Sequence, residues 1–400
     1  MKWALAAVVC ATLLTGITTV AADPTPLNVP ADYPTIQAAI DSASAVPGTH
    51  EVVVAQGTYQ ECIRIHKPLT VRSEDPDSAA ISAKTILRAP AGSTEPVVSF
   101  EVTGGAAYSY LKGLTITGAN SSEAAVLVGN RARVGIYRCV ITGNDCSGIR
   151  RNPDSRGSTG YCTIRDNEGA GVEFWYCGGL LGHSSIRNNS VCGVVINGVA
   201  QAPLPTGEKT VTVTQNVIHG NGGSGSGGGV RLTNGAQPML RSNTIAHNSA
   251  GFGAGIACLS SQPTIEGCIV AYNEGAAGIA CDAASDPTVR YTCVFGNTSA
   301  YQDMDDPTGS DGNIAADPLF ADHGHSDYHL KSQSGRWHRG SWVTDDVTSP
   351  CIDAGNPSIS VVDEPAPNGG RLNMGAYAGT EYASKSPATR RPGRPPAGGR

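Results

Sequence analysis

Asparagine recurs at near-regular intervals through the middle of the chain, and this recurrence constrains the fold more than any other feature. The intervals between successive members are 23, 22, 32, 27, 25 and 24 residues. An isoleucine or valine stands three residues before each of the first six, and a glycine followed by isoleucine or valine comes shortly after each. Three features that repeat in phase indicate a solenoid in which each repeat forms one coil. The asparagines are Asn144, Asn167, Asn189, Asn221, Asn248, Asn273 and Asn297.

The residue types within each repeat select the kind of solenoid. Each repeat holds two or three short β-prone runs and no helical pattern, and the leucine pattern of leucine-rich repeats is missing. We therefore predict an all-β, single-stranded, right-handed parallel β-helix whose coils stack about 4.8 Å apart. The 50 glycines among 400 residues fit this fold, because glycine and asparagine tolerate the left-handed backbone of tight bends.

Composition changes along the chain predict its division into parts. The N-terminus has Lys2, an apolar run and small residues before Asp23, a pattern typical of a secretory signal. We therefore expect a secreted, periplasmic or cell-surface protein. The predicted parts are a signal peptide at residues 1–22, an N-terminal helical cap with the first coils at 23–96, β-helix repeats at 97–300, a non-repeating C-terminal cap at 301–383 and a disordered basic tail at 384–400.

Charge and cysteine content limit which binding partners are expected and whether the cysteines can form disulfides. The formal net charge is −6, and the body of the chain is acidic, which argues against broad nucleic-acid binding. No later apolar run is long enough to span a membrane. Loss of the signal peptide would remove Cys10 and leave eleven cysteines. Stacking would bring Cys139 to Cys162 and Cys258 to Cys281, as disulfides or as reduced residues of a core ladder.

Both ends of the chain resemble known families. The opening resembles that of pectin-lyase-like β-helix proteins, pectin methylesterases included, at residues 33–41, 57–61 and 65–71. The end is similar to that of exported bacterial β-helix repeat proteins of planctomycete type, at residues 316–320, 327–330, 349–355 and the Asn-Met-Gly-Ala-Tyr run at 373–377. These resemblances imply the fold but no particular reaction. The residues at 34–41 themselves predict a short amphipathic helix, with proline at its start and apolar residues on one face.

Two enzyme activities of β-helix proteins lack their expected residues. A pectin methylesterase would need paired aspartates with partner motifs in the middle coils. Gln302 and Asp303 resemble the family's Gln-Asp pair, but they follow the last repeat. A mannuronan epimerase would need an Asp-Pro-His-Asp string, which the sequence does not contain.

The positions just before the repeated asparagines suggest a charged stripe. Stacking would place Arg165 beside Arg187 and near Asp166, with His219 and His247 further along. An arginine pair suits a carboxylate or sulfate, and calcium-assisted polysaccharide lyases use an arginine or lysine base. We therefore regard the first three residues as catalytic candidates and the two histidines as substrate-binding candidates. The alternative is an ordinary solvated face.

A second surface candidate follows one of the repeat glycines. Alternation from Val172 would direct Glu173 and Trp175 outward, with Tyr176 beside them. A tryptophan next to a carboxylate suits a sugar, because the ring face meets pyranose C–H groups. The alternative is a cap over the inserted coil, with Arg150 and Arg231 forming ion pairs to the carboxylate.

Calcium is the cofactor that the sequence suggests. The acidic run after the last repeat consists of Asp303, Asp305, Asp306 and Asp311, and its spacing does not match an EF-hand loop. A solvated loop is the alternative. We interpret His323, His325 and His329 as surface histidines because no ligand spacing connects them.

The sequence thus favours an exported β-helix protein that binds an acidic polysaccharide along its lateral face. One alternative is a polysaccharide lyase or related enzyme acting on uronate-containing glycans. The other is a structural or adhesive cell-surface solenoid.

Overall fold

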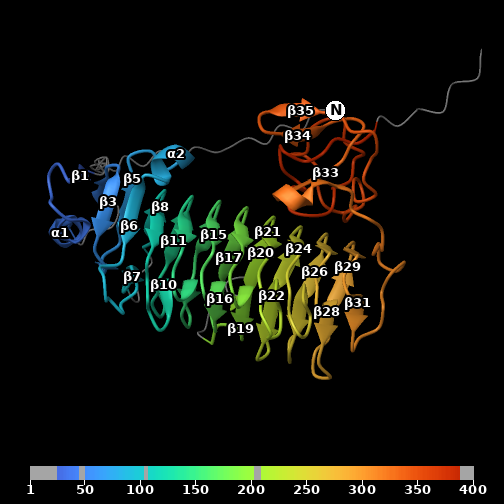
Figure 1. Ribbon diagram of the computed structural model, residues 1–400, viewed down its shortest axis with the longest axis horizontal. Helices are drawn as coiled ribbons and strands as arrows, with labels where there is room; N and C mark the ends of the chain where they lie inside the picture. Colours follow the sequence, from blue (N-terminus) through green and yellow to red (C-terminus); the bar gives the residue numbers. More distant parts are fainter. Residues whose placement is uncertain (1–24, 45–49, 103–106, 202–208, 388–400) are drawn as a thin grey trace, which may run out of the picture.

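The computed structural model describes residues 25–44, 50–102, 107–201 and 209–387 (Figure 1). The predicted signal peptide with Cys10, and residues 388–400 of the predicted tail, lie outside the described residues. Three long parallel sheets, here called sheets A, B and C, run the length of the solenoid. Each coil passes through one strand of each sheet in that order, and all neighbouring strands within these sheets are parallel. The chain is a right-handed parallel β-helix, as predicted.

Sheet A consists of β1 (Thr25–Val29), β2 (His50–Val54), β5 (Thr70–Ser73), β8 (Ser109–Lys112), β11 (Val134–Tyr137), β14 (Ser158–Gly160), β17 (Gly179–Gly182), β20 (Val211–Thr214), β23 (Met239–Arg241), β26 (Thr264–Glu266) and β29 (Thr288–Arg290). Sheet B consists of β3 (Gly57–Gln60), β6 (Thr85–Arg88), β9 (Thr115–Thr117), β12 (Val140–Thr142), β15 (Thr163–Arg165), β18 (Ser185–Arg187), β21 (Val217–His219), β24 (Thr244–Ala246), β27 (Ile269–Ala271) and β30 (Cys293–Phe295). Sheet C consists of β4 (Ile63–Ile65), β7 (Val98–Phe100), β10 (Ala124–Val128), β13 (Ser147–Arg151), β16 (Ala170–Trp175), β19 (Cys192–Asn197), β22 (Val230–Thr233), β25 (Ile256–Cys258), β28 (Ala277–Cys281) and β31 (Ser299–Gln302).

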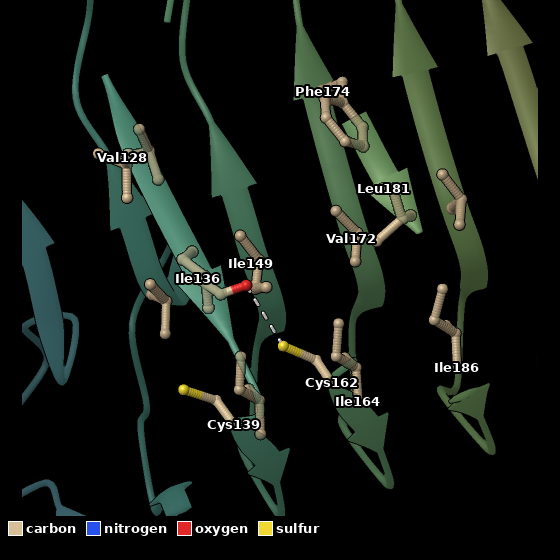
Figure 2. Close-up of a cluster of buried hydrophobic side chains, with 14 of the residues drawn as sticks. Val128, Ile136, Cys139, Ile149, Cys162, Ile164, Val172, Phe174, Leu181 and Ile186 are labelled. Carbon is tan, nitrogen blue, oxygen red and sulfur yellow. Dashed lines mark hydrogen bonds between the residues drawn. The ribbon is translucent and has the colours of Figure 1, made fainter. Parts of the chain in front are cut away.

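The interior of the solenoid is filled by stacked aliphatic side chains. In sheet B, Ile141, Ile164 and Ile186 lie in register on successive coils and are fully buried. Figure 2 shows Ile164 and Ile186 in the interior together with Ile136 of sheet A and Ile149 of sheet C. Burying each such side chain stabilises the fold by roughly 1.5–3 kcal/mol, so the repeated branched residues found in the sequence are the core.

The repeated asparagines form a buried hydrogen-bonded ladder at the bend between sheets B and C. The Nδ2 of each one donates to the Oδ1 of the next at 2.8–3.0 Å, from Asn144 through to Asn297. Most of these amides also donate to a backbone carbonyl of an earlier coil, such as Asn189 to Ile164. The ladder explains why asparagine recurs once in each repeat, because each coil must supply an amide that hydrogen-bonds to the buried amides of the coils on either side.

A second ladder occupies the bend between sheets A and B. Ser184, Asn216 and Asn243 are linked by bonds from the backbone N–H of one to the side-chain oxygen of the next at 3.0–3.1 Å. Cys139 and Cys162 hold the equivalent positions in the two preceding coils: the Cys162 N–H donates to Ser184 Oγ at 3.1 Å, and its thiol donates to the Ile136 carbonyl at 3.6 Å (Figure 2). The cysteines of the described residues are all free thiols, which agrees with the reduced-ladder alternative.

The N-terminal coil is covered by helix α1 (Ile36–Ser42), close to the predicted position. Thr35 caps it by accepting from the Ala38 N–H at 3.1 Å. The Glu61 carboxylate accepts from the N–H groups of Ile36 and Gln37 at 2.9 and 3.0 Å. A second helix, α2 (Ala79–Ser82), lies between β5 and β6.

The C-terminal region differs from the predicted end cap. Residues 316–387, here called the C-terminal segment, fold back beside the solenoid (Figure 1). They contain β32 (Phe320–Asp322), the 3-10 helix η1 (His323–His325), β33 (Asp327–Leu330), β34 (Arg336–His338) and β35 (Ser341–Val343), which form two antiparallel pairs. Residues 384–387 belong to this segment and not to the predicted tail, since Ser384 Oγ donates to the Leu330 carbonyl at 2.6 Å.

The outer face of the later coils explains this docking. The outward side chains of sheet B become apolar there, at Ala246, Ile269, Ala271 and Cys293, and they pack under Phe320, Tyr328, Leu330, Cys351 and Met374. Backbone contacts fix the segment, with the Gly375 N–H donating to the Gly267 carbonyl at 2.8 Å. An apolar surface of this kind is unfavourable in water, so the segment covers the side of the helix where the coils are apolar.

Candidate functional site

The structure brings together the three residues predicted as catalytic candidates. Arg165 of β15 and Arg187 of β18 lie opposite one another on neighbouring coils, on the outer face of sheet B. Asp166 contacts the Arg165 guanidinium and accepts a hydrogen bond from Asn188 Nδ2 at 3.2 Å. Within the described part of the chain, Arg187 forms no ion pair. The pair therefore has one arginine held by a carboxylate and one whose charge is unpartnered.

The predicted stripe is divided by the C-terminal segment. His219 follows Arg187 in register on the next coil, but it is only 7% exposed, and its ring packs 5.1 Å from that of Tyr328. His247 Nε2 lies 3.0 Å from His323 Nδ1. The two arginines thus remain on the open part of sheet B, whereas the two histidines hold the C-terminal segment.

The titration of the histidines follows from this burial. Burial lowers the pKa of His219 to about 4, with further contributions from Arg187 and His247. Burial and the neighbouring His323 lower the pKa of His247. Both rings are therefore neutral near pH 7 and add no positive charge to the arginine pair.

Two rows of outward side chains cross the open part of sheet B beside the C-terminal segment. One row is Tyr161 in the bend before β15 followed by Thr163 and Arg165 of that strand, and the other is His183 in the bend before β18 followed by Ser185 and Arg187. We call these six residues the strip. The strip runs from the bend between sheets A and B to the bend between sheets B and C. At its first end, Tyr161 and His183 stack in parallel with ring centroids 4.7 Å apart.

Sequence reasoning missed this aromatic end of the strip. The sequence did contain a signal for it. The residue before each member of the second ladder lies in the bend and has a positive φ. Glycine suits that backbone, yet the chain places large side chains there: Arg138, Tyr161, His183 and Gln215.

The second predicted surface candidate is satisfied internally. Glu173 is 8% exposed, and its carboxylate accepts from Ser147 Oγ at 2.5 Å, Arg150 Nε at 2.8 Å and Trp175 Nε1 at 2.8 Å. The Tyr176 ring lies against Gly198 of the next coil. Arg231 is separated from Glu173 by Val195 in the register. The Arg150 ion pair is formed, and a sugar would have to displace existing bonds to reach the carboxylate.

The acidic run does not converge on a calcium site. The Asp306 carboxylate accepts from the Thr308 N–H at 2.8 Å, and the Asp303 carboxylate from Gln302 Nε2 at 3.3 Å. No group of three or more histidine, cysteine, aspartate or glutamate side chains with metal-binding geometry occurs in the described ranges, which include Asp305 and Asp311.

The three C-terminal histidines serve separate contacts. His325 Nδ1 lies 2.8 Å from an Asp322 oxygen, and His329 Nδ1 lies 2.6 Å from an Asp327 oxygen. His323 pairs with His247 as described above. No helix in the described residues is long and apolar enough to cross a membrane.

Comparison with known proteins agrees with this fold. The family described as "Right handed beta helix region" matches residues 205–310, and the family described as "Disaggregatase related" matches residues 274–355. The first match covers the later coils, and the second covers the last coils with the start of the C-terminal segment. Among curated proteins, none matches this sequence significantly.

Two solved structures share the architecture. The A-module of the mannuronan C-5 epimerase AlgE4 of Azotobacter vinelandii is 16% identical with a TM-score of 0.53, over 66% of this chain and 74% of the module. The pectate lyase Pel9A is 14% identical with a TM-score of 0.50, over 85% of this chain and 89% of the lyase. At these identities the likeness shows the β-helix fold alone.

Proposed function

We propose that this protein is an exported β-helix that binds an acidic polysaccharide across the outer face of sheet B. The observation that carries the proposal is the pairing of Arg165 with Arg187 on neighbouring coils. The two arginines stand on strands about 4.8 Å apart, and their positive charges repel one another. An anionic group placed between them relieves this repulsion.

The chemistry of guanidinium favours carboxylate or sulfate as that group. The planar fork of arginine donates two parallel hydrogen bonds to such an anion. Arg187 is half-buried and has no partner carboxylate among the described residues, so its donors remain available. Asp166 orients the neighbouring Arg165 while leaving this second guanidinium free.

The comparisons support a polysaccharide as the source of the anion. The two solved structures described above are named for action on mannuronan and on pectate. Export, which the predicted signal peptide at residues 1–22 would direct, places the protein where such polymers occur.

Affinity electrophoresis in gels containing polygalacturonate or alginate tests the proposal. The full chain should be retarded, and the double variant Arg165→Ala/Arg187→Ala should bind roughly tenfold more weakly or worse, since two charged hydrogen-bonding groups are lost. Arg64→Ala removes an exposed arginine elsewhere on the solenoid and is the matched control.

Three results would overturn the proposal. They are no retardation of the unaltered protein in either acidic gel, equal retardation of the double variant, and equal weakening by Arg64→Ala. Ultraviolet absorbance from unsaturated uronate ends in the same incubations would make the protein a lyase as well as a binder.

A further inference from the structure

A groove lies between the bend that joins sheets A and B and the C-terminal segment. Its volume is about 860 Å³, and its solenoid wall is formed by the positive-φ bend residues of four successive coils. Its other wall is formed by Asp363 and residues 379–382. A smaller hollow of about 290 Å³ continues it past Arg138 and Tyr161 towards Pro76.

The four residues of the solenoid wall have a left-handed backbone, which is unfavourable for residues with a Cβ. Arg138, Tyr161, His183 and Gln215 have φ values of 54°, 56°, 50° and 56°. A residue with a Cβ loses roughly 1–2 kcal/mol in this region. At the same bend in other coils the chain uses glycine, at Gly113 and Gly267. Substitution by glycine would remove the backbone strain at these four positions. Because the chain keeps large side chains there, we infer that these side chains have a function.

Packing accounts for the other tyrosines with this backbone but not for Tyr161. Tyr176, Tyr272 and Tyr291 each lie against a glycine of the following coil, at Gly198, Gly296 and Gly312. Tyr161 is held between the Arg138 guanidinium at 4.8 Å and the His183 ring at 4.7 Å, and it remains 53% exposed. Its hydroxyl and ring edge therefore face the groove.

An aromatic residue also stands on the opposite wall. Tyr382 of the C-terminal segment is 42% exposed, and its ring lies 5.6 Å from that of Trp337. Tyr161 and Tyr382 are both among the exposed large apolar side chains of the described residues, and both line this groove. The groove thus has an amphipathic aromatic group on each side.

The charges of the groove select against anions. Asp363 and Glu381 line the C-terminal wall, and on the solenoid wall the Arg138 guanidinium is already paired with Asp77. Burial lowers the pKa of His183, so this ring is neutral near pH 7. The groove therefore holds an excess of carboxylates, together with hydroxyl and amide groups that bond well to sugar hydroxyls.

We propose that this groove binds uncharged sugar residues, with the Tyr382 ring contacting their C–H surfaces and with the Tyr161 hydroxyl and the carboxylates bonding to their hydroxyls. The inference rests on the proposed function only in taking the ligand to be a polysaccharide. Tyr161 and Arg165 are four residues apart in the chain, which is at most about 14 Å. A short run of sugar residues can therefore reach from the groove to the arginine pair.

Calorimetric titration of the full chain with cellohexaose, mannohexaose and xylohexaose tests this proposal. We expect at least one of these neutral oligosaccharides to bind, and Tyr161→Gly and Tyr382→Ala each to weaken its binding roughly tenfold. Because glycine suits the left-handed bend, Tyr161→Gly should keep or raise the melting temperature. Loss of binding in that variant then cannot be attributed to unfolding.

Tyr108→Ala is the matched control, because Tyr108 is an exposed tyrosine outside this groove. The proposal is overturned if none of the three oligosaccharides binds the unaltered protein, or if Tyr161→Gly and Tyr382→Ala bind as tightly as Tyr108→Ala. The two proposals fail separately: Arg165→Ala/Arg187→Ala should retain binding of the neutral oligosaccharide, and Tyr161→Gly should still be retarded by polygalacturonate.

Discussion

The side-chain amide of Asn167 donates to Oδ1 of Asn189 at 2.9 Å, at a bend between sheets B and C that is closed to solvent. Asn189 in turn donates to Oδ1 of Asn221 at 2.8 Å. Because every member is both donor and acceptor, removing one leaves buried polar groups on both neighbours with fewer partners.

Asn189→Ala should therefore lower the free energy of unfolding by roughly 2–3 kcal/mol. Urea denaturation measures the change. Asn120→Ala, which alters an exposed asparagine outside the ladder, should shift stability by less than about 0.5 kcal/mol. Equal effects of the two substitutions would mean that the ladder does not stabilise the solenoid.

The ladder was predictable from the sequence, whereas the covering of sheet B was not. Each coil repeats the same bend, so the chemistry that the bend requires appears at a fixed period in the sequence. The partner of His219 is Tyr328, more than a hundred residues later and outside the repeat. A hint was present, since the outward position held by Arg187 becomes Ala246 and Ala271 in later coils.

Glu173 illustrates a second limit of sequence reasoning. Strand alternation predicts that its side chain leaves the core, and it does. Alternation cannot predict that Ser147, Arg150 and Trp175 converge on the same carboxylate, because two of these residues come from the preceding coil. Outward direction therefore did not mean availability to a ligand.

Glu173→Gln tests this structural role. The substitution removes the charge that pairs with Arg150, so we expect a loss of roughly 1–3 kcal/mol in the free energy of unfolding. Retardation in polygalacturonate gels should be unchanged. Glu168→Gln, at an exposed glutamate in the same coil, should leave stability nearly unaltered. Weakened glycan binding with unaltered stability would instead indicate that Glu173 contacts the glycan.

Glu266 should be an anchor of the C-terminal segment. Its carboxylate is 1% exposed and lies between Arg241 Nε at 3.1 Å and Arg290 Nε at 2.5 Å, and it accepts from Asn356 Nδ2 at 3.2 Å. Glu266→Ala would leave two arginines facing one another and would free Asn356. We expect a loss of roughly 2–4 kcal/mol, reduced by the partial exposure of both arginines.

Limited proteolysis distinguishes local release from global unfolding of the Glu266→Ala variant. Cleavage within the C-terminal segment should become faster while the coils remain protected. Glu274→Ala, at an exposed glutamate of a neighbouring coil, should leave the cleavage rate unchanged. Uniformly faster cleavage of the whole chain would argue that Glu266 supports the solenoid itself.

Docking of the C-terminal segment should weaken in acid because of His219. Its folded-state pKa of about 4 lies below the ordinary value of 6.5, so between these two values the unfolded state binds the proton more readily. The stability contribution is therefore complete above pH 6.5 and is lost as the pH falls towards 4, by on the order of 3 kcal/mol. The groups that face the ring are Arg187, His247 and Tyr328, and none of them is an acid that would hold its proton.

His219→Phe separates this contribution from that of the other titrating groups, because it keeps an aromatic ring against Tyr328 without a proton-binding site. Urea unfolding, followed by the fluorescence of Trp337 and Trp342 in the C-terminal segment, should show a shallower loss of stability between pH 6.5 and 4 in the variant than in the unaltered protein. Both proteins also lose stability in acid because carboxylates are protonated. The effect of His219 is therefore the difference between the two slopes of stability against pH. Identical slopes would show that the pKa of His219 is not lowered in the folded protein, so that its burial does not make the docking of the segment depend on pH.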